Sequence, residues 1–306
     1  MDNVLSSIFD GITTFDPQNY KNMTVVGLDI SENRNIDLMS LKIGFDLGLV
    51  EICEVDEKGS VNEVKVINKA VTPLLILDGE EIIGSKQNRI VNSTIIIEAK
   101  SEKIIPVSCT EAGRWEYNTS KFHYSKHMAS SNVRKNKLHS VSNSLRLNNK
   151  FNSNQFEVWN NISQTEEKLN VHSQTGALND AYKNKSLDIE EYSNSFKIHD
   201  KQNGFIVYIN GRLVGMEMIY NNRRYNEYHD KLLESYIIDA ISKSNDEYEN
   251  DKIKDDEFIE EIKKSECESF DSVGLGVDYR LENENISGSA VLFKDALINA
   301  SFFRKV

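Results

Sequence analysis

The sequence predicts an α+β protein, with an antiparallel β-sheet or sandwich-like N-terminal half and a helix-rich, mixed α/β C-terminal half. Alternation of apolar and polar residues, which is typical of strands, recurs over residues 20–112. Apolar residues at helical spacing over residues 225–241 predict an amphipathic helix. Asn210-Gly211, the most favoured two-residue hairpin signal, joins two apolar segments and predicts that strands return in the C-terminal half.

The strands of the N-terminal half are predicted from alternation and from the turn residues between them. Residues 74–77 are all apolar, as in a strand that is buried on both faces, and the turn dipeptide Asp78-Gly79 follows them. The polar turn Lys100-Ser101-Glu102 separates two further strands. Besides residues 74–77, the expected strands cover residues 39–45, 64–67, 93–98 and 103–108.

Residues 117–152 break this pattern, because they are rich in Ser, Asn and Lys and show little periodicity. They predict a basic loop, flap or mobile insert, since residues 121–150 carry seven Lys and Arg residues and no acid. We therefore expect a mainly β region over residues 1–116, this insert, and a mixed helix and strand region over residues 153–306. The last region is expected to pack on the first in one compact unit.

The C-terminal half is predicted to begin with two helices. Phe156, Trp159 and Ile162 share one helix face, and residues 173–176 form a cap-like stretch before the second helix. The acidic stretch 246–268 is expected to form a solvated helix at most. The expected strands of this half cover residues 204–210, 213–219, 273–279 and 290–303.

Charge and cysteine content exclude several classes of protein. A net charge of −12 over 306 residues disfavours nonspecific coating of nucleic acid, which depends on neutralising phosphates. Three widely spaced cysteines and an N-terminus without a signal-peptide pattern predict a reducing, cytoplasmic location. The apolar runs are too short to span a membrane. The local excess of basic residues favours a small anionic, nucleotide-like ligand over extended nucleic acid. The formation of a homo-oligomer is compatible with the sequence.

A dense polar segment follows the predicted strand at residues 74–77. It offers two acids, Glu80 and Glu81, and then the amide and basic side chains of residues 86–89. Such groups need partners, because burying one unpaired costs about 1–3 kcal/mol. The segment is either a ligand-binding or catalytic wall or a hairpin whose charges pair with one another. The candidate ligand-binding side chains are Lys86, Gln87, Asn88 and Arg89.

A second polar segment follows the predicted strand at residues 103–108. Cys109 is a candidate nucleophile or ligand contact, although a lone cysteine at a strand end is more often a small buried residue. Glu111 and Arg114 form either a structural ion pair or a general base beside an anion clamp. Trp115 stacks on a base or packs in the core. We expect the two segments to converge, so that Glu81, Arg89, Glu111 and Arg114 line one pocket.

The remaining motifs carry little chemistry. His123 and His127 have a spacing that would place both on one face of a helix, but the surrounding sequence is not convincingly helical, and neither a metal nor a cofactor is expected. The Gly-rich dinucleotide and phosphate motifs and the hydrolase motif GxSxG do not occur in the sequence.

The two polar segments resemble a known family. The string Leu77-Asp78-Gly79-Glu80-Glu81, with Lys86-Gln87-Asn88-Arg89, Cys109-Thr110-Glu111 and Gly113-Arg114-Trp115, is similar to the ARG-and-rhodanese-phosphatase-superfamily-associated protein domain, first type. ARG stands for ADP-ribosylglycohydrolase. The resemblance covers most of the chain from about residue 20. It implies an association with ADP-ribose and nucleotide processing in microbial conflict, including that between phage and host, but no established activity.

Three functions follow from these observations. The first is the binding of an ADP-ribose-like or cyclic nucleotide, with Lys86, Arg89 and Arg114 on phosphates, Trp115 on the base, and the basic insert as a lid. The second is a hydrolase that cleaves a glycosidic or phosphate bond with Glu80, Glu81 or Glu111 as general base. The third is a protein–protein interaction module. The sequence does not decide whether the protein is an enzyme.

Overall fold

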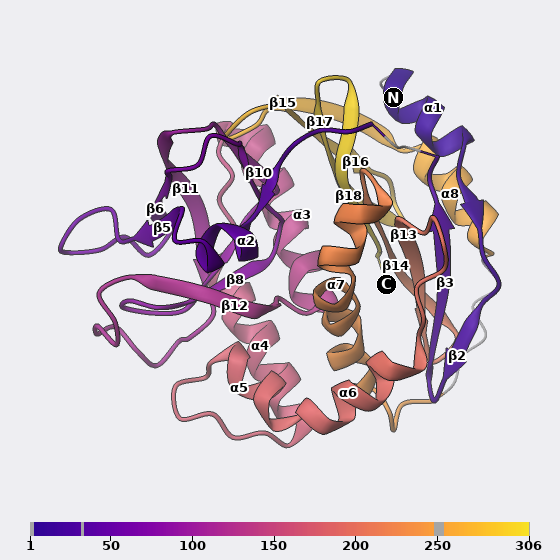
Figure 1. Cartoon of the computed structure of the whole chain (residues 1–306). Coiled ribbons are helices and arrows are strands. Elements are labelled where there is room, and N and C mark those ends of the chain that lie inside the picture. The colour runs from indigo at the N-terminus through magenta and orange to yellow at the C-terminus, as the bar shows by residue number, and fades with distance from the viewer. Residues whose placement is uncertain (1–2, 32–33, 248–253, 306) are drawn as a thin grey trace. The chain divides into compact units, whose positions relative to one another are not determined.

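A computed structural model of the chain describes residues 3–31, 34–247 and 254–305. The chain folds into two compact units (Figure 1). Unit 1 comprises Met1–Asn35, Lys185–Asp271 and Gly276–Val306, and unit 2 comprises Ile36–Asn184 and Ser272–Leu275. These boundaries differ from the predicted divisions at residues 116 and 152. Helices and mostly antiparallel strands occur in both units, which confirms the predicted α+β class.

Unit 2 is built on a six-stranded antiparallel sheet, in the order β12-β8-β9-β11-β6-β5. The outer strands β5 and β12 also lie next to each other, so the sheet encloses an apolar interior that contains Val64, Ile82, Val107 and Phe122. A smaller sheet, in the order β10-β7-β4, contributes to the same core. The strands are β4 (Met39–Ser40), β5 (Val50–Cys53), β6 (Glu63–Asn68), β7 (Leu74–Ile76), β8 (Glu80–Gly84), β9 (Arg89–Val91), β10 (Ile95–Ile97), β11 (Ser101–Cys109) and β12 (Phe122–Met128).

The helices of unit 2 include one that was not predicted from the sequence. The prediction of a loop or flap is wrong for most of residues 117–152, which form β12 and the 18-residue helix α3. Its buried apolar residues Val133, Leu138, Val141 and Leu145 do fall on one helix face, but α3 also buries the cations Arg134 and Lys137 among them. The predicted strand at residues 39–45 is also mostly helix. The helices are α2 (Leu41–Asp46), α3 (Ser131–Asn148), α4 (Gln155–Leu169) and α5 (Leu178–Asn184).

Unit 1 contains a nine-stranded antiparallel sheet, in the order β1-β3-β13-β14-β18-β17-β16-β15 with β2 paired to β3. The predicted hairpin is confirmed, because β13 and β14 are joined by Asn210 and Gly211, both with positive φ (50° and 77°). The strands are β1 (Thr13–Thr14), β2 (Gln18–Tyr20), β3 (Met23–Asp29), β13 (Gly204–Ile209), β14 (Arg212–Ile219), β15 (Glu266–Asp271), β16 (Val277–Glu282), β17 (Ile286–Phe293) and β18 (Ala296–Arg304).

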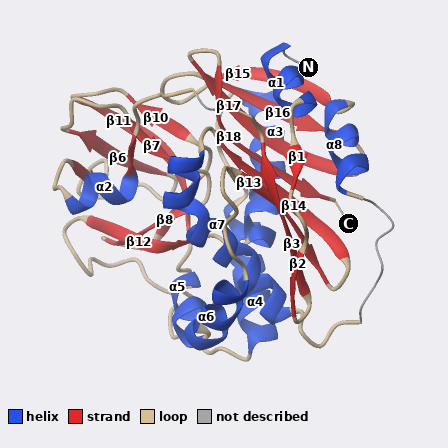
Figure 2. Ribbon diagram, turned by 45° about the vertical axis from the view of Figure 1, so that its right-hand side comes forward, coloured by secondary structure: helices blue, strands red, loops and turns tan. Residues whose placement is uncertain are grey.

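The apolar face of this sheet is covered by α1 and α8 (Figure 2). The predicted helix at residues 225–241 is confirmed as α7. Part of the acidic stretch 246–268 lies outside the described residues. Most of the remainder forms α8 and the start of β15. α8 is not fully solvated, because it buries Phe258 and Ile262. The predicted strand at residues 290–303 is a hairpin of two strands, β17 and β18. The helices are α1 (Asn3–Asp10), α6 (Ser186–Ser195), α7 (Asn222–Ser242) and α8 (Asp255–Lys263).

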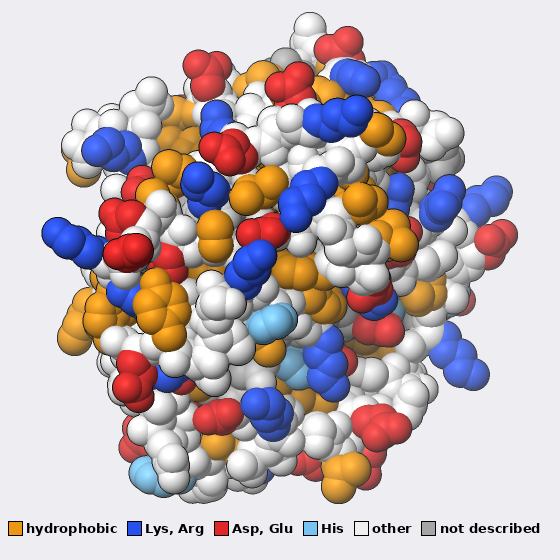
Figure 3. Space-filling view, turned by 60° about the vertical axis from the view of Figure 1, so that its left-hand side comes forward, with side chains coloured by type: hydrophobic (Ala, Val, Ile, Leu, Met, Phe, Trp, Pro, Cys, Tyr) orange, Lys and Arg blue, Asp and Glu red, His pale blue; other side chains and the backbone are white. Residues whose placement is uncertain are grey.

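Two general properties bear on partners. Within the described residues, no helix combines the length and the apolar character that crossing a membrane requires. On the face shown in Figure 3, Lys and Arg side chains are interspersed with Asp and Glu side chains.

Candidate functional site

Strand pairing brings the two polar segments of the sequence together. β9 pairs with β8 on one side and with β11 on the other. The Asn88 N–H donates to Glu111 Oε2 at 3.2 Å, and Gln87 Nε2 donates to the Glu111 carbonyl at 2.8 Å. The prediction that the segments converge is therefore confirmed.

The predicted site residues nevertheless lie on two faces of the β8–β9 hairpin. Glu81 lies opposite Ile90, whereas Arg89 lies opposite Ile82. Because side chains alternate along a strand, Glu81 and Arg89 point to opposite faces. A single pocket lined by both Glu81 and Arg89 therefore does not form, and this part of the prediction is wrong.

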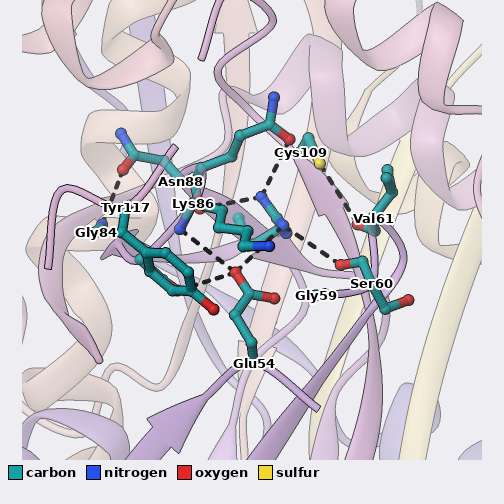
Figure 4. Close-up of polar contacts among 12 residues, drawn as sticks. Glu54, Gly59, Ser60, Val61, Gly84, Lys86, Asn88, Cys109 and Tyr117 are labelled. Atoms are coloured by element: carbon teal, nitrogen blue, oxygen red, sulfur yellow. Dashed lines mark hydrogen bonds and ion pairs between the residues drawn. The ribbon is translucent and has the colours of Figure 1, made fainter. Parts of the chain in front are cut away.

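Arg89 lies at the centre of one of these faces. This first face also comprises Glu54, Lys86, Trp115 and Tyr117. The Arg89 guanidinium is fully buried, donates to the Gln87 carbonyl at 3.0 Å and to the Ser60 carbonyl at 3.4 Å, and lies 3.7 Å from Glu54 Oε1. Glu54 Oε1 also accepts from Ser85 Oγ at 2.9 Å. Arg89 Nε and Glu54 Oε2 are both buried, and neither has a hydrogen-bond partner among the residues that the structure describes. The Glu54 carboxylate and the Arg89 guanidinium are therefore paired only loosely, in the surroundings that Figure 4 shows around Glu54.

Lys86 lies at the exposed edge of this face. Its ammonium donates to the carbonyls of Glu57 (3.0 Å) and Lys58. It also lies 5.4 Å from the centre of the Trp115 ring and 5.0 Å from that of Tyr117. Trp115 is 45% exposed and Tyr117 is 50% exposed, so both rings offer surface to a ligand. Trp115 also covers the Arg89 guanidinium, at 5.6 Å.

Glu111 and Arg114 form an internal ion pair beside this face. Arg114 donates to the two Glu111 oxygens at 2.9 and 2.6 Å and to the carbonyls of Ser85 and Glu116. Burial alone would raise the pKa of Glu111. The hydrogen bonds from Arg114 and Thr175 outweigh this effect and hold the pKa below its usual value. Glu111 is therefore an ionised carboxylate that already has partners. Of the two alternatives for Glu111 and Arg114, the structure shows the ion pair.

The other candidate acids and the candidate nucleophile are enclosed. Burial raises the pKa of Glu81, although hydrogen bonds from Asn179, Ser125 and Thr110 oppose the shift. Glu80 is buried, and its Oε2 accepts from the N–H of Leu77 at 2.8 Å. A general base needs access to a proton on the substrate. Glu80 and Glu81 lack such access because both are buried.

Cys109 has the properties of a buried structural thiol. Burial raises its pKa to about 11, so the thiol stays protonated at neutral pH. Its Sγ donates to the Val61 carbonyl at 3.4 Å (Figure 4). Because only the thiolate is a strong nucleophile, Cys109 contributes to holding the neighbouring loop rather than to chemistry in this state.

The two spaced histidines have different environments. His123 is exposed, whereas His127 is buried and stacks on Tyr182 with 4.4 Å between ring centres. Across the part of the chain that the structure describes, no group of three or more His, Cys, Asp or Glu side chains is arranged to hold a metal ion.

Two residues of the first face were not predicted from the sequence. Tyr117 directly follows the second polar segment, whereas Glu54 lies well before the first, and no motif spacing pointed to either. Glu54 directly follows β5, a strand that was not predicted, so the sequence offered no signal for it. A carboxylate at a strand end, next to a loop, can reach the interior of the site while its backbone stays at the surface.

A separate carboxylate in α4 gives a testable pH dependence. Burial, and then the negative charge of Asp180, raise the pKa of Glu166 to about 7. Because the folded pKa lies above the unfolded one, Glu166 is protonated more readily in the folded protein, and stability is lost as pH rises toward 7. We expect Glu166→Gln to raise Tm by about 2–4 °C at pH 8, with a discount for its partial exposure, and to change it little at pH 4. Thermal melts at both pH values would measure this, and an equal effect at both would contradict it.

Comparison with known proteins identifies the family. Residues 11–303 match the family described as ARG and Rhodanese-Phosphatase-superfamily-associated Protein domain, and the chain belongs to this family. The match covers both units and confirms the resemblance found in the two polar segments. No curated protein and no solved structure matches the chain.

Proposed function

We propose that this protein binds a small anionic nucleotide of the ADP-ribose or cyclic-nucleotide class at the first face of the β8–β9 hairpin. The observation that carries the proposal is the loosely paired Glu54–Arg89 couple beneath a half-exposed tryptophan. An unsatisfied buried polar group costs about 1–3 kcal/mol. A protein that retains one unsatisfied acceptor and one unsatisfied donor at the same place gains when a ligand satisfies both. The family association with ADP-ribosylglycohydrolases supports a setting in microbial or phage conflict, in defence or anti-defence.

The chemistry of the face fits the parts of a nucleotide. The partly exposed Trp115 ring offers a stacking surface for a base. Lys86 presents a charged ammonium at the exposed edge of the face, and a phosphate oxygen would bind this ammonium in place of the loop carbonyls to which it donates. The unsatisfied atoms of Glu54 and Arg89 would bind a group with an adjacent donor and acceptor, such as the edge of a base or a ribose hydroxyl. Arg114 supports the face from within, since its donors are used inside the protein.

The test is Trp115→Ala. Loss of the stacking surface should weaken the binding of ADP-ribose or cyclic AMP, measured by titration calorimetry, by about 1–3 kcal/mol. Phe156→Ala is the matched control, because Phe156 is another exposed aromatic residue of unit 2 (74% exposed) that lies on α4. We expect this control to bind as the wild type does.

Two results would contradict the proposal. One is that neither nucleotide binds the wild-type protein, and the other is that Trp115→Ala and Phe156→Ala reduce affinity equally. Mass spectrometry of the nucleotide after incubation separates binding from catalysis. Because Glu80 and Glu81 are enclosed and Glu111 is already paired, we expect the nucleotide to be recovered unchanged.

A further inference from the structure

Residues 54–62, which connect β5 to β6, form a loop with few apolar anchors. Its tip, residues 56–58, is exposed, and Val61 is 39% exposed. Glu54 is its one well-buried side chain, held at Ser85. The strands at the two ends of the loop are held in the sheet, because β5 pairs with β6 as far as Cys53, which lies opposite Lys65. A loop of this kind can open without unfolding the sheet, and its stability depends on hydrogen bonds rather than on burial.

Side chains of the polar segments hold this loop by its backbone carbonyls. Lys86 donates to Glu57 (3.0 Å) and to Lys58. The other contacts are longer, at 3.4 Å each, and come from Arg89 to Ser60, from Cys109 to Val61 and from Tyr117 to Glu57. Bonds from an ammonium are charge-assisted and stronger than those from a thiol or a phenol. Lys86 is therefore the main contact that keeps the tip of the loop in place.

The same loop lies over the atoms that lack partners. The ideal Cβ position at Gly59 would lie 3.2 Å from Glu54 Oε2 and 3.1 Å from Lys86 Cδ, so the backbone of the loop rests directly on both side chains. The loop therefore covers Glu54 Oε2, and its Ser60 carbonyl contacts the guanidinium of Arg89. A ligand that approaches from the side of the loop can reach Glu54 Oε2 only if the loop moves.

We propose that Lys86 is a latch, which holds residues 54–62 closed in the free protein and releases them when an anionic group binds its ammonium. The proposal rests on the proposed function, because the same lysine would bind the phosphate of the nucleotide. A phosphate oxygen carries a full charge and competes for the ammonium more strongly than two neutral carbonyls do. Release of the tip then uncovers Glu54 and Arg89 for the rest of the ligand. Ligand recognition and loop opening are thus coupled through one side chain.

The latch is tested first without ligand. Lys86→Met removes the ammonium but keeps an unbranched apolar side chain. In the full-length protein, hydrogen exchange of peptides covering residues 54–62 should become about tenfold faster, because loss of about 1.4 kcal/mol of local stabilisation corresponds to that factor. Lys121→Met is the matched control, since Lys121 lies directly before β12 and pairs with Glu51 of β5 at 2.9 Å rather than with the loop tip. Unchanged exchange in Lys86→Met, or equal acceleration in both variants, would overturn the latch.

The release is tested with ADP-ribose and, as an anion without a base, with inorganic pyrophosphate. ADP-ribose should accelerate exchange of residues 54–62 in the wild type toward the rate of Lys86→Met. If calorimetry shows that ADP-ribose binds while exchange of the loop stays unchanged or slows, release is wrong and the proposed function stands. If neither ADP-ribose nor cyclic AMP binds, the proposed function and the release both fail. The comparison of Lys86→Met with Lys121→Met still decides whether Lys86 holds the loop.

Discussion

Replacing Lys137 by methionine should lower the free energy of unfolding by about 3–5 kcal/mol, the scale for removing one partner of a buried ion pair. Lys137 is 1% exposed, contacts Asp78 Oδ1 and donates to the Asn92 carbonyl at 3.1 Å. Asp78 is itself buried at the turn after β7, and its nearest other cation, Arg134, lies 3.8 Å away. The variant would thus leave the buried Asp78 carboxylate with only the more distant Arg134 to compensate its charge. Chemical denaturation with urea would measure the loss.

The control and the double variant make this prediction specific. Arg146→Met removes an exposed cation from the last turn of the same helix and should cost less than about 1 kcal/mol. Asp78→Asn combined with Lys137→Met removes both charges, so its cost should be smaller than the sum of the two single effects. Additive costs would show that the two side chains do not act as a pair. A loss in Lys137→Met no larger than that in Arg146→Met would show that the pair contributes little to stability.

Helix α3 was not predicted, although its buried apolar residues Val133, Leu138, Val141 and Leu145 fall on one helix face. The many Ser, Asn, Lys and Arg residues between these apolar positions made the segment read as a loop, and two of the cations are buried because Asp78, more than fifty residues earlier, lies beside them. Local sequence gives no sign of such a partner. The helix α7 was predictable because its buried face is formed largely by Tyr, Leu and Ile.

Two other differences have local causes. Residues 39–45 alternate as a strand does, yet α2 begins at Leu41 because Ser40 caps it by accepting from the Ile43 N–H. The turn between β17 and β18 consists of Lys294 and Asp295, both with positive φ (53° and 57°). Neither residue is the glycine or asparagine by which such a turn is recognised, so two strands were predicted as one.

Most residues of the candidate site could be predicted from the sequence, but the directions in which their side chains point could not. The sequence places Lys86, Arg89, Glu111 and Arg114 in two polar segments after neighbouring strands, and the structure brings these segments together. Strand register, which decides that Glu81 faces away from Arg89, depends on hydrogen-bond pairing that the sequence does not show. The contribution of Glu54 depends in the same way on where the β5–β6 loop folds back.

Replacing Arg114 by alanine should destabilise the free protein by about 2–4 kcal/mol, because it leaves the buried Glu111 carboxylate without its bidentate partner. The loss should depend on pH. In the wild type the pKa of Glu111 is lowered, so its contribution to stability is present above the pKa of the unfolded chain and is lost as pH falls through the folded value. In Arg114→Ala that contribution disappears, so the difference in Tm between variant and wild type should be larger at pH 7 than at pH 3.

Thermal melting of Arg114→Ala with and without ADP-ribose then decides the role of the arginine. All of its contacts lie within unit 2, so we expect the variant to melt lower without ligand and yet to gain the same stabilisation from the nucleotide as the wild type gains. Lys103→Ala, which removes an exposed cation of β11, is the control and should leave both values unchanged. The opposite pattern, normal melting with no response to the nucleotide, would mean that Arg114 binds the phosphate directly. In that case the ion pair with Glu111 would be a resting contact that the ligand replaces.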